Sequence, residues 1–325
     1  MSKTLVVGGA GYIGSHMVLH LLQQKEEVIV LDNLSTGSKK AVLGGTFYEG
    51  DLADRKLLRK IFKEHAIDAV MHFAAFIQVG ESVTDPYKYY ENNVANTLVL
   101  LDEMIKANIK NFIFSSTAAT YGEPHYCPID IQHPQNPINP YGHSKLMVEQ
   151  ILKDFDTAYG LRSTILRYFN AAGAEGEKIG FHEPITHLIP QILKAASGRK
   201  PNVSIYGTDY NTKDGTCYRD YIHVMDLAAA HLLALKHMKK TGQSAIYNLG
   251  NGQGFSVKEV VNAVKKVTGK DFEVIETPKR LGDPAQLIAD SQLAKNTLNW
   301  QPQYSSLENI IADAWAWELN DSWHV

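Results

Sequence analysis

The sequence predicts an α/β fold in which a doubly wound parallel sheet is followed by a smaller C-terminal α/β domain. Short apolar runs alternate with amphipathic stretches through the first half of the 325 residues, and parallel strands need helical crossovers that cover both faces of their sheet. After Asn170 this rhythm gives way to a segment rich in glycine and glutamate, 171–180, and then to a helix punctuated by proline. We therefore expect one domain over 1–170, joined by parts of 220–250, and a second over 171–325.

Apolar periodicity places the expected elements along the chain. The expected strands are 4–7, 28–31, 69–73, 112–114, 164–166, 203–206, 245–249 and 272–275. The expected helices are 13–24, 54–65, 93–107, 184–197 and 226–239. The last of these helices and the strand at 245–249 are expected to return to the first sheet.

Composition is typical of an ordinary globular protein, with 44% hydrophobic and 21% charged residues. The 32 basic and 35 acidic residues nearly balance, so no global field favours nucleic acid or a membrane surface. Cys127 and Cys217 form no C-x-x-C pair, the 13 histidines show no metal-ligand spacing, and no leader-like or membrane-spanning run occurs. We expect a cytoplasmic protein without a metal, whose partners are small molecules or other folded subunits.

A glycine-rich turn follows the first expected strand. In G-G-A-G-Y-I-G, Gly8, Gly11 and Gly14 leave room for a pyrophosphate at the start of a helix, where free N–H groups and the helix dipole favour an anion. Asp32 ends the next strand, 18 residues after Gly14, at the spacing of an acidic ribose ligand. This combination predicts a Rossmann-type sheet that binds NAD, because a carboxylate repels the 2′-phosphate of NADP. Asp51 is either an adenine ligand or a loop and helix cap.

Tyr141 and Lys145 lie four residues apart in Y-G-H-S-K, so on a helix they share one face. A nearby lysine cation favours a phenolate, which is a useful general base. Thr117 ends the S-S-T run after an apolar strand, at the sheet edge where ligands bind in such folds. Its hydroxyl either relays a proton or caps a turn.

These motifs together resemble the extended short-chain dehydrogenase/reductase family, and nearly the whole chain is similar to its UDP-galactose (UDP-glucose) 4-epimerases. The resemblance is carried by G-G-A-G-Y-I-G, L-D-N-L, G-D-L, H-F-A-A, V-G-E-S-V, N-N-V, S-S-T-A-A-T-Y-G, P-Y-G-H-S-K, R-Y-F-N and R-D-Y-I-H-V-M-D. It implies that Tyr141 is the base for the sugar 4-hydroxyl, that Lys145 holds the nicotinamide ribose and that Thr117 assists at the sugar. It also implies a 4-keto intermediate, tightly bound NAD regenerated in every cycle, and a homodimer formed through two helices of the first domain.

The resemblance also implies two sets of binding residues. The cofactor set is Gly8, Gly11, Tyr12, Ile13, Gly14, Asp32, Asn33, Asp51, Leu52, Phe73, Ala74, Ala75, Asn92, Ser115, Tyr141, Lys145 and Tyr168. The UDP-sugar set is Thr117, Tyr141, Asn170, His187, Leu188, Tyr206, Arg219, Arg280, Asp283 and Leu287. Two arginines suit a diphosphate, since each guanidinium offers a rigid fork of donors.

Three positions depart from the family pattern. Ile77 stands where many relatives have a lysine near the nicotinamide, and His187 replaces an asparagine beside the nucleotide. Leu287 lies between the large tyrosine and the small residues that admit an N-acetyl group on the sugar. We therefore expect UDP-glucose and UDP-galactose as the main substrates, with N-acetylated sugars poorer.

The same motifs occur in proteins with other functions, which we weigh as alternatives. Related dehydratases and decarboxylases place acidic residues after the position of Thr117, whereas this chain has Ala118 and Ala119, so elimination lacks its acid. A 4-epimerase of another UDP-sugar, such as UDP-N-acetylglucosamine or UDP-glucuronate, stays open. So does a non-catalytic NAD-sensing protein on the same fold.

Overall fold

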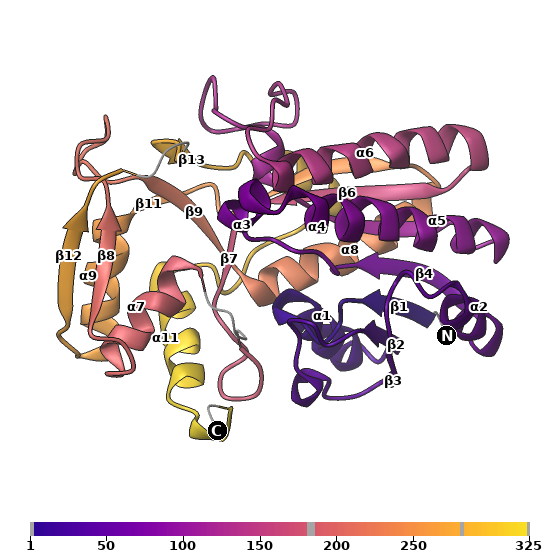
Figure 1. The fold of residues 1–325 in the computed structure, drawn as a ribbon, viewed down its shortest axis with the longest axis horizontal. Coiled ribbons are helices and arrows are strands. Elements are labelled where there is room, and N and C mark those ends of the chain that lie inside the picture. Colours follow the sequence, from indigo (N-terminus) through magenta and orange to yellow (C-terminus); the bar gives the residue numbers. More distant parts are fainter. Residues whose placement is uncertain (1–2, 181–185, 280–282, 324–325) are drawn as a thin grey trace.

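A computed structural model describes residues 3–180, 186–279 and 283–323, and its centre is a seven-stranded parallel sheet (Figure 1). The strand order is β10-β6-β5-β4-β1-β2-β3. The chain builds outward from β1 in one direction and then from β4 in the other, so the order reverses between these two strands. The strands are β1 Lys3–Val7, β2 Glu27–Asp32, β3 Thr46–Glu49, β4 Ile67–His72, β5 Asn111–Thr117, β6 Arg162–Tyr168 and β10 Ala245–Leu249.

Helices cover both faces of this sheet. On one face lie α1 (Tyr12–Gln23) and α8 (Val224–Thr241), and on the other lie α2 (Arg55–Glu64), α5 (Asn96–Lys106) and α6 (Pro140–Tyr159). Successive side chains of a strand point to opposite faces, so in β1 Val6 packs with the first pair of helices while Leu5 and Val7 pack with the second group. Burial on both faces explains why the strands read as continuous apolar runs.

The local sequence determines where α6 begins and ends. Asn139 caps its first turn by accepting a 2.8 Å hydrogen bond from the backbone N–H of Gly142, and Pro140 occupies the first helical position. Gly160 ends the helix in the left-handed conformation with φ 64°. The first turns of α6 lie at the carboxyl edge of the sheet, beside the end of β5.

A second group of elements packs beside the large sheet, at the left of Figure 1. Strand β9 (Tyr218–His223) pairs with three short strands, β7 (Asn170–Ala172), β11 (Gly254–Ser256) and β13 (Gln286–Leu287). A two-stranded sheet and three helices surround a second apolar cluster: β8 Asn202–Tyr206, β12 Glu273–Thr277, α7 Leu188–Ala196, α9 Val257–Thr268 and α11 Leu307–Glu318. The remaining elements are η1 Lys39–Ala41, α3 Val79–Thr84, α4 Pro86–Tyr90, η2 Glu91–Ala95, η3 Ala118–Thr120, α10 Gln292–Leu298 and η4 Asp321–Trp323.

The doubly wound parallel sheet confirms the predicted fold class, and β10 pairs with β6 as expected for a strand that returns to the first sheet. The helix expected at 93–107 is divided, because the π-helical turn η2 occupies Glu91–Ala95 before α5 starts. Within η2 the buried side chain of Asn93 exchanges 3.0 Å hydrogen bonds with both backbone groups of Phe76, a tertiary demand that periodicity does not reveal. The helix expected at 184–197 begins at Leu188, and 184–185 lie outside the described residues. None of the described helices is long and apolar enough to cross a membrane.

Candidate active site

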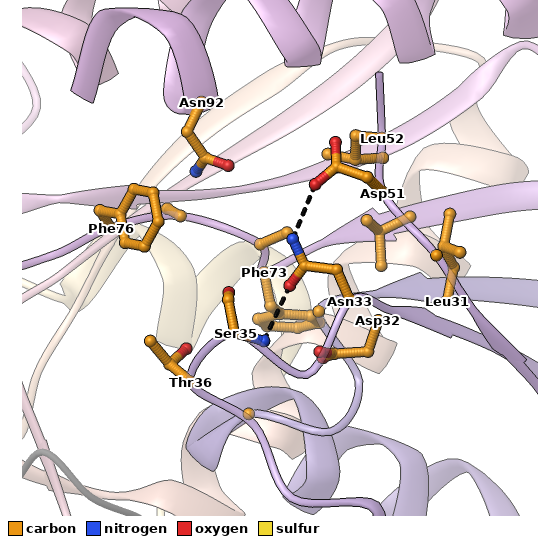
Figure 2. Close-up of a pocket in the computed structure, with 16 residues that line it drawn as sticks. Leu31, Asp32, Asn33, Ser35, Thr36, Asp51, Leu52, Phe73, Phe76 and Asn92 are labelled. Atoms are coloured by element: carbon orange, nitrogen blue, oxygen red, sulfur yellow. Dashed lines mark hydrogen bonds between the residues drawn. The ribbon is translucent and has the colours of Figure 1, made fainter. Parts of the chain in front are cut away.

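A cavity opens at the carboxyl ends of β1, β2 and β4 (Figure 2). It is lined by Val7, Gly8, Gly11, Leu31, Asp32, Asn33, Ser35, Thr36, Gly50, Asp51, Leu52, Phe73, Ala74, Ala75, Phe76 and Asn92. The structure thus brings together most of the predicted cofactor residues. Sequence reasoning missed Val7, Leu31, Ser35, Thr36, Gly50 and Phe76. Their only signal was position, since each adjoins a predicted residue or follows Asp32 in the same loop.

The glycines of the first turn are required by close approach of backbone segments. Gly8 has φ +78°, and a Cβ there would lie 2.5 Å from the backbone nitrogen of Ala74. A Cβ on Gly14 would lie 2.0 Å from the carbonyl oxygen of Gly8. Gly11, the N-cap of α1, brings no capping side chain, so the first N–H groups of the helix remain available to an anion. This cradle fits the pyrophosphate of a dinucleotide.

Asp32 is a buried carboxylate held by the backbone on both oxygens. Its Oδ2 accepts a 2.9 Å hydrogen bond from Ala10 N–H, and its Oδ1 accepts a 2.8 Å bond from Leu34 N–H. Burial raises the pKa of Asp32, and these backbone N–H groups oppose the rise. The carboxylate is therefore fixed at the end of β2 on the cavity wall, where it can accept from ribose hydroxyls.

Asp51 faces the same cavity from the loop after β3. Its Oδ2 accepts a 2.7 Å hydrogen bond from the amide of Asn33, drawn in Figure 2, and its Oδ1 accepts a 2.8 Å bond from Ala53 N–H. The contact with Ala53 forms a local turn in the loop, whereas the cap of α2 is Asp54, which accepts from the backbone N–H groups of Lys56 and Leu57. The helix-cap role predicted for Asp51 is therefore wrong, while the loop role and the adenine role are both compatible with this geometry.

Tyr141 and Lys145 lie in the first turns of α6 next to the end of β5. Lys145 is only 4% exposed, and its Nζ donates a 2.9 Å hydrogen bond to the carbonyl oxygen of Ser115. The same nitrogen lies 4.9 Å from the centre of the Phe114 ring. Burial lowers the pKa of Lys145 to about 7, and the negative charge of Glu149 opposes this.

The pKa of Tyr141 differs from what the spacing predicts. Burial raises it to about 12, and the nearby Thr117 hydroxyl opposes this rise. The spacing predicts a phenol whose pKa is reduced by Lys145, but the ammonium is directed to the Ser115 carbonyl. The chain alone thus keeps Tyr141 protonated at neutral pH, and forming the phenolate requires a further positive charge close to it.

The other predicted cofactor residues divide into two groups. Ser115 and Tyr168, neighbours on β5 and β6, are joined by a hydrogen bond between their hydroxyl groups, and burial raises the pKa of Tyr168. Tyr12 turns away from the cavity and donates a 2.7 Å hydrogen bond to the carbonyl oxygen of Gly173, while Ile13 packs against the core. Residues 12–14 can therefore serve a cofactor only through their backbone N–H groups.

Part of the predicted UDP-sugar set gathers around β9. Arg219 is paired in register with Leu287 of β13, forms an ion pair with Asp283 and donates a 2.9 Å hydrogen bond to the carbonyl oxygen of Pro284. Leu287 packs on a small apolar cluster that contains Ala118, the residue after Thr117. This contact brings the β9–β13 pair up to the catalytic end of β5.

The remaining predicted substrate residues lie on other elements. Asn170 lies on β7, opposite Tyr221 of β9. His187 is the N-cap of α7, directly before Leu188, and it is exposed. Tyr206 ends β8 with its side chain 38% exposed. Arg280 lies outside the described residues.

Two further observations limit the chemistry. Ala118 and Ala119 form the 3₁₀ turn after Thr117, where the Ala119 N–H donates a 3.1 Å hydrogen bond to the Thr117 hydroxyl, so neither position supplies an acid or a base. Among the described residues, no three His, Cys, Asp or Glu side chains gather in a way that could hold a metal ion. Ile77, which stands where many relatives have a lysine, is 48% exposed.

A family model described as the NAD dependent epimerase/dehydratase family matches residues 4–250. A UDP-glucose 4-epimerase of Halalkalibacterium halodurans is 54% identical over 315 residues, which cover 96% of this chain and 94% of that protein.

Solved structures agree in fold. The crystal structure of a UDP-glucose 4-epimerase from Brucella ovis in complex with NAD is similar at a TM-score of 0.94, with 49% identity, and the match covers 97% of this chain and 98% of that one. A UDP-glucose 4-epimerase from Bifidobacterium longum in complex with NAD⁺ and UDP has a TM-score of 0.93 at 39% identity, with 99% of each chain covered. The predicted resemblance is confirmed.

Proposed function

The chain belongs to the NAD dependent epimerase/dehydratase family, and from that premise we propose that it interconverts UDP-glucose and UDP-galactose with the residues described above. Its reaction is the NAD-dependent 4-epimerisation of a UDP-sugar. One observation carries the residue assignment: Tyr141 and the buried Lys145 share a face of α6 at the end of β5, beside Thr117 and without an acid at the next two positions.

The cavity residues hold the cofactor. The backbone N–H groups of residues 12–14 bind the pyrophosphate, Asp32 binds the adenosine ribose, and Asp51 with Leu52 borders the adenine. Phe73, Ala74, Ala75 and Asn92 form the opposite wall. Bound NAD supplies a hydride acceptor and donor for carbon 4 of the sugar, together with a positive charge.

Tyr141 removes the proton of the sugar 4-hydroxyl and later returns one to the same oxygen, after the 4-keto sugar has turned and presented its other face. Thr117, whose hydroxyl lies near Tyr141, orients the reacting hydroxyl. Lys145, whose ammonium is fixed by the Ser115 carbonyl, holds the nicotinamide ribose. The positive charge of bound NAD would be the further charge that favours the phenolate. A single residue serves as base and acid because the reaction returns the proton it takes.

The residues around β9 hold UDP and leave the sugar free to turn. Arg219 binds the diphosphate and Asp283 the uridine ribose, with Arg280 as the second diphosphate ligand expected from the family pattern. Asn170, His187, Leu188 and Tyr206 complete the nucleotide site. Leu287, packed near Ala118, borders the sugar and makes N-acetylated sugars poorer substrates.

Two domains divide this work. Residues 1–170 with parts of 220–250 form the NAD-binding unit, which is supported by the pairing of β10 with β6 and the packing of α8 on the sheet. Residues 171–325 form the UDP-sugar unit, whose own apolar core lies between α7, α9 and α11.

A second copy of the chain covers the outer side of α3 to α6. Large apolar side chains are exposed there: Val79, Val83, Tyr87, Leu98 and Met147. These elements lie together at the upper right of Figure 1, and an exposed apolar patch of this kind is typical of an interface. Light scattering of the purified protein should give the mass of a dimer.

We assign the enzyme to the cytoplasm, which agrees with its two free cysteines.

The function is tested by incubating the purified protein, without added cofactor, with UDP-galactose, UDP-N-acetylgalactosamine and UDP-galacturonate in separate reactions. Conversion of UDP-galactose to UDP-glucose, with little turnover of the other two, is the expected result. Comparable turnover of UDP-N-acetylgalactosamine or UDP-galacturonate would replace the substrate assignment. A protein that holds NAD but converts none of the three would favour the non-catalytic alternative.

A further inference from the structure

We propose that Glu149 is a positioning residue for the epimerase reaction, fixing the end of β5 against α6 and supporting the charge of Lys145. This inference rests on the proposed catalytic roles of Tyr141 and Lys145. Glu149 follows them at the same four-residue spacing, so all three side chains lie on one face of α6.

The carboxylate of Glu149 is completely buried and fully bonded. Arg167 of β6, 2% exposed, donates to Oε1 from Nε at 3.0 Å and to Oε2 from Nη2 at 2.5 Å. Ser116 donates a 2.5 Å hydrogen bond to Oε1, and Gln135 donates a 3.1 Å bond to Oε2. A buried carboxylate with this many donors is held in one orientation.

The contact with Ser116 connects Glu149 to the reacting groups. Ser116 stands between Ser115, whose carbonyl oxygen accepts from Lys145, and Thr117, whose hydroxyl lies near Tyr141 and lowers its pKa. Alternate side chains of a strand point to opposite faces, so Ser116 is the member of this run that faces α6. Glu149 thereby anchors the strand end that aligns both catalytic partners.

The same network continues to the predicted sugar wall. Arg167 Nη1 donates a 2.9 Å hydrogen bond to the Tyr121 hydroxyl, which donates a 2.7 Å bond to Asn248 Oδ1. Asn248 in turn donates 2.8 Å to the carbonyl oxygen of Ile129, and Ile129 N–H donates 2.8 Å to the carbonyl oxygen of Ile288, the residue after Leu287. The network therefore connects Glu149 to the end of β5 and to the backbone next to Leu287.

The charges around Lys145 make Glu149 important for its protonation. His72 faces it from β4 and stays neutral, because burial lowers the pKa of that imidazole to about 3. Tyr89 of α4 and Tyr168 of β6, which face Tyr141, keep their protons because burial raises the pKa of each phenol. Arg167 is engaged with Glu149 itself. The carboxylate of Glu149 raises the pKa of Lys145, against the lowering by burial.

The test compares the Glu149→Gln and Glu149→Asp variants with wild type in the kcat-against-pH profile for UDP-galactose. Lys145 acts as a cation, so activity falls as pH rises through its pKa. Glu149→Gln should move this alkaline limb down by about one pH unit and lower kcat about tenfold to a hundredfold, with KM changed little. Glu149→Asp keeps the negative charge, so the alkaline fall of the kcat profile should occur at the wild-type pH. Its shorter side chain no longer reaches Ser116, so kcat should remain below the wild-type value.

Two further measurements keep the inference falsifiable if Glu149→Gln folds poorly. The double variant Glu149→Gln/Arg167→Met removes both charges of the buried ion pair, and such a paired replacement is often neutral for stability. Its kcat profile should still show the alkaline fall at the lower pH of Glu149→Gln. NMR of ε-labelled lysine, assigned with Lys145→Arg, should show the pKa of Lys145 lowered in both proteins. An unchanged limb and an unchanged lysine pKa would overturn the inference. An inactive wild type would instead overturn the proposed function, since the variants are compared only against an active enzyme.

Discussion

The ammonium nitrogen of Lys145 lies 2.9 Å from the carbonyl oxygen of Ser115, so the chain itself binds this lysine of α6 to the end of β5. Lys145→Met keeps the aliphatic stem but removes the donor and the charge. We expect kcat to fall by about a hundredfold or more, because the end of β5 loses its tie to α6 and the nicotinamide ribose loses the ligand proposed for it. Steady-state kinetics with UDP-galactose, beside a Lys153→Met control on exposed α6 surface, measure this. Near wild-type turnover would contradict the assigned role.

Tyr141→Phe removes the proposed base while preserving the ring. Turnover should fall by roughly two to four orders of magnitude, while the NAD released on denaturation should stay at the wild-type amount. This pair of readouts separates an epimerase from an NAD-sensing protein, for which the hydroxyl would be irrelevant. Loss of NAD together with activity would instead assign Tyr141 to cofactor binding.

Asp32→Asn tests the preference for NAD. The amide retains an acceptor for one of the two backbone donors, Ala10 or Leu34, but no longer repels a 2′-phosphate. The ratio of NADP to NAD affinity should rise about tenfold or more, which is about 1.4 kcal/mol. Calorimetric titration of cofactor-stripped protein measures the ratio. Asp51→Asn is the matched control, and an equal change in that variant would deny Asp32 a special role.

Leu287 is predicted to limit the size of the group on carbon 2 of the sugar. Leu287→Ala should raise the kcat/KM for UDP-N-acetylglucosamine relative to UDP-glucose about tenfold, and Leu287→Tyr should lower the same ratio. Ile288→Ala is the control, because the Ile288 side chain lies on the side of Gly254. If all three variants keep the wild-type ratio, another residue sets this specificity.

His231 should make the folded protein less stable in acid. Its ring is buried between Phe73 and Tyr168, and burial lowers its pKa to about 4 from the usual 6.5. Below pH 6.5 the imidazole of His231 takes up a proton in the unfolded chain but stays neutral in the folded chain. The free energy of unfolding therefore drops as pH falls toward 4. His231→Asn retains a donor for the Leu227 carbonyl and should reduce this slope by about 1.4 kcal/mol per pH unit. Urea denaturation at several pH values measures it, and parallel slopes would refute it.

Local patterns predicted the first sheet well because its signals are contained in short stretches of chain. Gly8 and Gly14 mark a turn that tolerates no Cβ, and the apolar runs of β1, β2 and β4 show burial on both faces. The sheet around β9 was missed, since β7, β11 and β13 have only two or three residues each and pair across long sequence separations. Such strands have too few positions to show a period.

The sequence by itself determined the fold class, the glycine cradle, Asp32 and the shared helical face of Tyr141 and Lys145, because each depends on residues close together in the chain. Tertiary structure alone decided where those groups point. It turned Tyr12 to Gly173, directed Lys145 to Ser115 and joined Glu149 to Arg167 of β6. It also raised the pKa of Tyr141, since desolvation depends on all the atoms packed around a group. Spacing along one helix does not contain that information.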